Sequence, residues 1–190
     1  MIKFHNIVFG CLLIFSSLVS NAGFAHEDNC VYTVHPPRLS VPSGEPGEVR
    51  RVIMQFYHWT LLCDENPSLG QGVCNVTQTI HDEEDHTIFS WSLVLTKSGQ
   101  AVMLLRMLPD ADINVPIQLF IEGKKEPIFI NYTQCDDTVC LAQILLEPVL
   151  SQLIEQESSV RIFYQLKDEK KFVFMAPFKG LREALTSLQR

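Results

Sequence analysis

The chain has 190 residues, of which 46% are hydrophobic, and a formal net charge of −7. This length suits one domain with a sizeable core, and the acidic balance argues against nucleic acid and anionic lipid as general partners, because both bind clustered Lys and Arg. No apolar stretch after Ala25 reaches the roughly 20 residues that span a bilayer, so we expect no transmembrane helix in the mature chain.

The first 25 residues have the features of a secretory signal peptide. Lys3 and His5 form a short polar start, residues 7–19 are apolar, and Ala25 ends a small-x-Ala cleavage motif. We therefore predict that residues 1–25 are removed and that the mature protein is exported to a compartment where disulfides persist.

Residues 26–48 follow the predicted cleavage site and contain four prolines among Ser, Gly and His residues. Such a composition is typical of irregular chain, so we expect an N-terminal arm that docks loosely. Residues 30–34 are the exception, because their apolar and β-branched residues would allow them to pair as an edge strand. The remaining residues, 49–190, are expected to form a single domain.

The domain itself is dominated by short segments rich in β-branched and aromatic residues, each ended by turn residues. Such segments recur every 8 to 12 residues, which is typical of an antiparallel sandwich or barrel. The expected strands are residues 52–63, 73–80, 89–96, 101–107, 117–122, 128–133, 141–145, 160–166 and 172–175.

Two segments depart from the strand pattern and predict short helices. In residues 147–157, apolar residues recur at helical spacing. In residues 180–189, Leu181, Ala184, Leu185 and Leu188 share one helical face. We expect the second helix to pack this apolar stripe over an open end or edge of the core, since an exposed stripe of this size is uncommon on soluble monomers.

The six cysteines divide into two close pairs and two single residues. Cys63 and Cys74 flank a turn-like loop, and Cys135 and Cys140 flank a tighter one, so we predict two local disulfides in an exported chain. A zinc site built from these four thiols is less favoured after export, because the thiolates would be oxidised first. Cys11 leaves with the signal peptide, and Cys30 either stays free or links two copies.

The most polar run is residues 81–86, which hold two histidines and four acidic residues. Carboxylates and imidazoles bind divalent cations, but the run lacks the ligand spacing and the glycine of a calcium loop. We expect a solvated connector between two strands and no metal.

No catalytic set is evident in the sequence. It contains no HExxH, CxxC, GxSxG or glycine-rich phosphate loop, and its histidines are scattered, with His58 expected to be exposed. Trp59 and Trp91 could anchor a recognition surface, yet each lies within an expected strand, so we place both in the core. We therefore predict no catalytic residues, no cofactor and no enzyme activity.

The order of several segments resembles the invasion-associated locus B family of bacterial envelope proteins. The resemblance runs from about residue 56 to residue 188, while Cys30 and the arm lie outside it. The matching segments are WTLLC at 59–63, CNVTQ at 74–78, IQLFIEG at 117–123, the cysteine loop at 135–140 and FKGL at 178–181.

This resemblance implies an immunoglobulin-like β-sandwich, located in the periplasm or outer envelope or secreted, and linked to host-cell invasion in pathogenic members. It carries no catalytic residues to transfer. We expect a non-enzymatic protein that acts through contacts with a host or envelope protein, in invasion or in envelope integrity. The alternative is a periplasmic chaperone-like or ligand-binding module, which an exposed apolar patch or an unpaired edge strand would favour.

Overall fold

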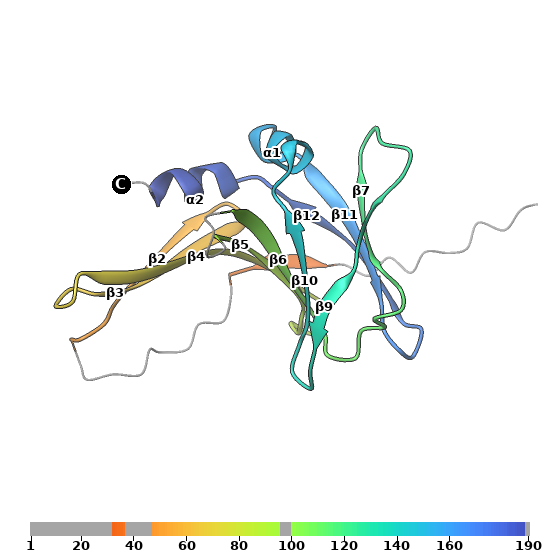
Figure 1. Cartoon of the computed structure of the whole chain (residues 1–190), viewed down its shortest axis with the longest axis horizontal. Helices are drawn as coiled ribbons and strands as arrows, with labels where there is room; N and C mark the ends of the chain where they lie inside the picture. The colour runs from red at the N-terminus through yellow and green to blue at the C-terminus, as the bar shows by residue number, and fades with distance from the viewer. Residues whose placement is uncertain (1–31, 37–46, 96–99, 189–190) are drawn as a thin grey trace, which may run out of the picture.

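The computed structural model describes residues 32–36, 47–95 and 100–188. The predicted signal peptide, Cys11, Cys30 and most of the predicted arm lie outside the described residues. Within them the chain forms two antiparallel sheets and two short helices, as the sequence predicted (Figure 1).

The larger sheet has eight strands, in the order β2-β3-β4-β5-β6-β10-β9, with β1 also paired to β4. Alternating side chains in these strands point into and out of the core, which is why the segments fold as strands. The strands are β1 (Thr33–His35), β2 (Arg50–Phe56), β3 (Trp59–Asn66), β4 (Gln71–His81), β5 (Thr87–Leu95), β6 (Ala101–Met107), β9 (Tyr132–Cys135) and β10 (Cys140–Leu145).

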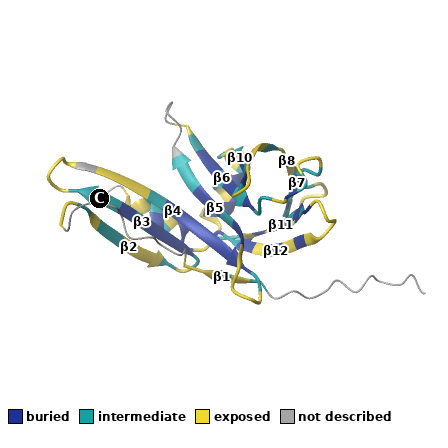
Figure 2. Cartoon of the chain, turned by 90° about the horizontal axis from the view of Figure 1, so that it is seen from below, coloured by how far each residue is buried: buried dark blue, intermediate teal, exposed yellow. Residues whose placement is uncertain are grey.

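The smaller sheet has four strands in the order β12-β11-β7-β8. These strands are β7 (Ile117–Ile121), β8 (Ile128–Ile130), β11 (Ser159–Gln165) and β12 (Lys171–Pro177). The inner faces of the two sheets pack on each other: the rings of Phe89 on β5 and Phe174 on β12 lie 5.1 Å apart. Buried residues are concentrated where the sheets face each other, and the hairpin tips are exposed (Figure 2).

Both helices lie where their spacing predicted them. Helix α1 (Pro148–Glu155) begins with a proline and buries Leu150, Leu153 and Ile154. Helix α2 (Leu181–Ser187) buries Leu181 and Ala184. Leu185 is only half-buried against the core and Leu188 is 42% exposed, so the expected apolar stripe packs along half of its length. None of the described helices is long and apolar enough to cross a membrane.

The run 52–63, which we expected to be one strand, is a hairpin. It turns at Tyr57 and His58, between β2 and β3. Tyr57 has a φ of 51°, a conformation that bulky residues rarely adopt, so nothing in its residue type signals the turn. His58 is half-buried in this turn rather than exposed on a strand.

The expected strand 128–133 is also divided. Residues 128–130 form β8 of the smaller sheet, Asn131 crosses between the sheets, and the next residues form β9 of the larger sheet. The apolar pattern is continuous across the crossing, so periodicity alone does not separate the two strands.

Part of the predicted arm is ordered against the core. Strand β1 pairs Thr33 with His81 and His35 with Thr79, in line with the expectation that this segment forms an edge strand. Next to it, the Tyr32 ring lies 6.3 Å from Phe172 and 5.8 Å from Phe174.

Candidate functional site

The outer face of the smaller sheet is largely apolar, and none of the described residues covers it. Strands β7, β8, β11 and β12 direct every second side chain toward the core, and the intervening side chains point outward. Several of these outward residues are large and apolar: Phe129 is 60% exposed, Met175 54% and Val173 40%. Phe120 and Phe163 are half-buried. We call this surface the aromatic face: Phe120, Phe129, Arg161, Phe163, Val173 and Met175.

The sheet register aligns these side chains in two rows across the strands. One row joins Met175, Arg161 and Phe120. In the neighbouring row, Val173 pairs with Phe163, and Gln118 connects Phe163 to Phe129. Because directly opposed residues of one face lie about 5 Å apart, the aromatic face is contiguous.

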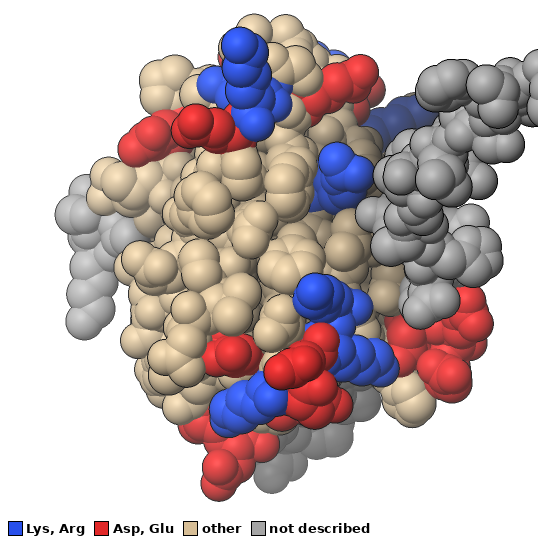
Figure 3. Space-filling view, turned by 90° about the vertical axis from the view of Figure 1, so that its right-hand side faces the viewer, with Lys and Arg blue, Asp and Glu red and all other residues tan. Residues whose placement is uncertain are grey.

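Figure 3 views the molecule from the side of the smaller sheet. A broad uncharged area lies between charged residues that gather at its upper and lower edges. Arg161 stands within the aromatic face, with its guanidinium carbon 5.3 Å from the centre of the Phe120 ring. No described carboxylate forms an ion pair with Arg161. An arginine over an aromatic ring, surrounded by apolar side chains, is typical of the centre of a protein interface.

The centre of the larger sheet differs in character on its outer face, because it buries hydroxyl groups, although Ile53 and Val73 are exposed elsewhere on this sheet. Thr77 Oγ1 donates to the Trp91 carbonyl at 3.0 Å and accepts from Ser92 Oγ at 3.0 Å. Arg106 Nη1 donates to Ser92 Oγ at 2.9 Å, and burial lowers the pKa of Arg106. This hydrogen-bonded network is satisfied internally and offers no apolar anchor.

The two tryptophans lie in the core, as the sequence predicted, and therefore form no recognition surface. Trp59 and Trp91 are both fully buried, and their rings stack 5.7 Å apart. Trp91 Nε1 donates to Gln78 Oε1 at 3.0 Å, and Trp59 Nε1 donates to the Pro177 carbonyl at 3.1 Å.

Both predicted disulfides are present in the structure. Cys63 and Cys74 are directly opposed on β3 and β4, with Cα atoms 4.0 Å apart. Cys135 and Cys140 close the β9–β10 hairpin with the same Cα separation. Both bonds link neighbouring strands, so they fix hairpins and contribute no reactive thiol. Cys30, which we considered for an intermolecular bond, lies outside the described residues.

The polar run 81–86 is only partly the solvated connector that we expected. His81 is 1% exposed, because it ends β4 under β1; its Nδ1 lies 2.8 Å from Asp85 Oδ1, and its ring centre lies 4.9 Å from that of His35. The prediction was wrong for this residue, because it did not foresee that β1 would pair with the end of β4. Asp82, Glu84 and His86 place ligand atoms within 4.8 Å of one another, a spacing that exposed acidic loops often show.

The aromatic face was not among the features predicted from the sequence. Its signal was nevertheless present: in residues 117–121 and 171–177, apolar side chains occupy both alternating sets of positions. A strand with two apolar faces is either buried on both faces or exposes one of them, and only the packing of the second sheet decides which.

The comparisons with known proteins agree with this fold. Residues 59–189 match the family described as invasion associated locus B (IalB) protein. No curated protein matches the chain.

Among solved structures, the chain is similar to the crystal structure of invasion associated protein B from Bartonella henselae. The identity is 16%, and the match covers 73% of this chain and 95% of that chain with a TM-score of 0.59. At this identity the likeness shows the fold. The family match spans more than half of the sequence, and the chain therefore belongs to the IalB family.

Proposed function

We propose that this protein is an exported, non-enzymatic envelope protein of the IalB type that acts by binding another protein through its aromatic face. The observation that carries the proposal is the contiguous set of Phe120, Phe129, Phe163, Val173 and Met175 around Arg161, which the described part of the chain leaves open. Exposed apolar patches on soluble proteins commonly mark interaction sites.

The composition of the aromatic face also indicates which chemical features its partner would have. Three phenylalanines and a methionine supply apolar contact area, which favours an apolar patch on the partner. Arg161 has a planar guanidinium suited to bidentate binding of a carboxylate, and no described acidic residue occupies it. We therefore infer a protein partner with an apolar contact patch and an acidic residue opposite Arg161.

Export and biological role belong to the same proposal. The signal-like residues 1–25 and the two disulfides support passage into an oxidising compartment, periplasmic or at the outer envelope. The family name supports a role in host-cell invasion, and envelope integrity is the related possibility. The immunoglobulin-like relationship also remains a proposal, supported by the two packed antiparallel sheets.

Site-specific photocrosslinking in the cells that make the protein tests the binding surface. Phe129 is replaced with the photoreactive amino acid benzoylphenylalanine, and Val73, which is 76% exposed on β4, receives the same replacement as a control. We expect a discrete crosslinked protein from position 129 and none from position 73. The additional substitution Arg161→Glu should abolish the crosslink. Identical products from both positions would contradict the proposal.

Export is tested separately by determining the N-terminus of the protein in each cell fraction. We expect the mature chain to begin at His26 in the periplasmic or envelope fraction. A chain that retains residues 1–25 in the cytosol would contradict export without affecting the binding surface.

A further inference from the structure

The two sheets leave a slot between β8 and β10. Where the chain crosses at Asn131, β9 joins the larger sheet, but it pairs with β10 only at Cys140, Leu141 and Ala142. Beyond Ala142, no described strand pairs with the outer side of residues 143–145. Strand β8 faces this gap and pairs only with β7. Two strand edges therefore border the same slot.

The backbone groups of β10 that face the slot are those of Gln143 and Leu145. The Leu146 amide donates to the Ala101 carbonyl at 3.1 Å, so Leu146 is directed toward β6. Backbone groups in an antiparallel strand alternate in direction, so Gln143 and Leu145 are directed away from β6.

Only some of these groups are left for another strand. The pairing of Ala142 with Tyr132 directs the Gln143 N–H at the Asn131 carbonyl. The Gln143 C=O and the Leu145 N–H therefore form the free edge that can accept another strand.

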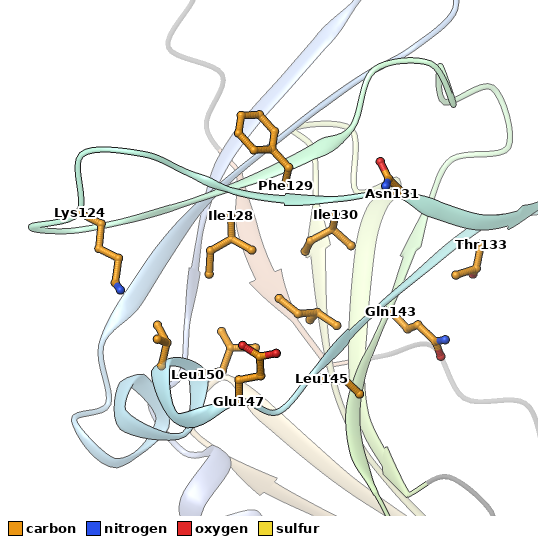
Figure 4. Close-up of a pocket in the computed structure, with 12 residues that line it drawn as sticks. Lys124, Ile128, Phe129, Ile130, Asn131, Thr133, Gln143, Leu145, Glu147 and Leu150 are labelled. Atoms are coloured by element: carbon orange, nitrogen blue, oxygen red, sulfur yellow. The ribbon is translucent and has the colours of Figure 1, made fainter.

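Behind the two edges lies a cavity of about 560 Å³, a size within the range of about 300–1,000 Å³ typical of ligand sites. Ile128 and Ile130 point into it from β8, and Leu150 closes it from α1, while Phe129 points away toward the aromatic face (Figure 4). The slot therefore has an apolar floor between two backbone edges.

Two charged side chains lie at the end of the slot that is next to α1. Lys124 and Glu147 both line it, one on each side (Figure 4). Neither forms an ion pair with a described residue. The opposite end is uncharged and is lined by Asn131, Thr133 and Gln143. A bound segment with an acidic and a basic residue near one of its ends would complement this arrangement.

We propose that this slot binds an extended peptide segment of another protein, which adds as a strand to the free edge of β10. The segment has apolar residues at alternate positions, whose side chains fill the cavity, and opposite charges near the end that meets Lys124 and Glu147. Strand addition draws its affinity from backbone hydrogen bonds and its specificity from pockets for alternate side chains, and the slot offers both. An acyl chain would use the apolar floor but leave both edges unpaired.

Peptide binding to the purified mature protein tests this proposal. The probes are fluorescent nine-residue peptides in which Val, Ile or Phe alternates with Thr, Lys or Glu. A control panel has the same composition with the apolar residues in one block. Binding is measured by fluorescence polarisation up to about 1 mM, which corresponds to the weakest useful affinity. We expect saturable binding from alternating peptides, strongest with Glu and Lys near one end, and slower hydrogen exchange of the Leu145 amide.

A matched pair of variants locates the binding. Leu145→Pro removes the amide that points into the slot, whereas Leu145→Val retains it. An edge strand tolerates proline where the N–H is unpaired, so both variants should fold. We expect Leu145→Pro to weaken binding about tenfold relative to Leu145→Val. Should Leu145→Pro fail to fold, Ile128→Asn, which changes the cavity and leaves β10 intact, takes its place and should weaken binding similarly.

Three results would overturn the proposal: no binding by any alternating peptide, equal binding by the two panels, or equal binding by the two Leu145 variants. Saturable binding of lauric acid without peptide binding would identify a small-ligand site instead. The slot is tested through β10 and the aromatic face through Phe129 and Arg161, so failure of one proposal leaves the other in place.

Discussion

The two sheets are joined differently along the two sides of the sandwich. On one side, the end of β12 is bonded to the larger sheet: Gln78 Nε2 donates to the Pro177 carbonyl at 2.9 Å, and Trp59 Nε1 donates to the same oxygen. We call this the closed seam. On the other side, β8 and β10 leave the slot described above, which we call the open seam.

The difference lies in how polar groups are satisfied. At the closed seam, buried amide and indole groups bond to one another, and Tyr32 packs over β12. At the open seam, the lining polar side chains of Asn131 and Gln143 are exposed. Buried and bonded polar groups hold a structure together, whereas an exposed edge with an apolar floor is available for binding. Stability and binding in the slot are therefore expected to reside on opposite sides of the molecule.

Gly180 offers the strongest test of the closed seam. It has a φ of +96°, and a Cβ atom there would lie 2.0 Å from the Phe56 carbonyl oxygen, so the turn before α2 requires glycine. We expect Gly180→Ala to lower the free energy of unfolding by about 4 kcal/mol or more. Gly123→Ala is the control, because its φ of +78° is similar but nothing lies within 4 Å; about 1 kcal/mol is expected there. Denaturant unfolding measures both, and equal losses would show that the close approach is unimportant.

Helix α2 tests the same seam through packing. Leu181 is fully buried, whereas Leu185 is only half-buried. We expect Leu181→Ala to cost about 3 kcal/mol and Leu185→Ala about 1 kcal/mol, because the cost follows the buried volume that is lost. Thermal and denaturant melts distinguish the two variants. A larger loss from Leu185→Ala would mean that the helix packs through its other face.

Gln78 and Gln143 compare the two seams directly, since both are glutamines on strands of the larger sheet. Gln78→Leu leaves the buried Trp91 N–H without an acceptor, so we expect a loss of about 2 kcal/mol. Gln143→Leu changes an exposed residue and should alter stability by less than about 0.5 kcal/mol. Urea unfolding of both variants measures the difference. Equal effects would remove the distinction between the seams.

Acid should have the smallest effect on stability. It should act on the loop that joins β9 and β10, the strands next to the open seam. In the β9–β10 loop, hydrogen bonds from the Thr138 hydroxyl, the Thr138 amide and the Val139 amide lower the pKa of the Asp136 carboxyl. A lowered pKa stabilises the folded state above the unfolded value of about 3.9, and this contribution is lost as the pH falls through the lower folded value.

We therefore expect the amides of the β9–β10 loop to lose protection below about pH 4, measured as the observed exchange rate relative to the intrinsic rate at the same pH. In Asp136→Asn this acid dependence of the protection should disappear, while the Cys135–Cys140 bond stays intact. Hydrogen exchange followed across pH measures both chains. Unchanged protection in the wild type would show that the Asp136 bonds do not hold the loop.

Much of the fold could be predicted because its signals are local. Cys63 and Cys74 flank one loop and Cys135 and Cys140 flank another, so hairpin geometry alone brings each pair within bonding distance. Likewise, the helical spacing in residues 147–157 and 180–189 placed both helices. Alternating apolar residues predicted the strands, since the period of 2 belongs to each strand by itself.

The errors arose where the local residue pattern carries no signal. Tyr57 forms the turn between β2 and β3 although its residue type does not favour one, and His81 is buried because the distant strand β1 covers it. Asn131 divides one apolar run between two sheets. None of these outcomes changes the local residue pattern, so no window of sequence could distinguish them.

The sequence by itself determined the two disulfide hairpins, the two helices, the strand-rich architecture and the family, because each depends on residues close together or on their order along the chain. Only the tertiary structure decided which strand faces are covered. Phe120, Phe129 and Phe163 form a surface because the larger sheet packs on the opposite side of β7, β8 and β11, and the slot exists because β9 pairs with only half of β10. Burial depends on what is stacked on a residue in space, and a one-dimensional pattern does not contain that information.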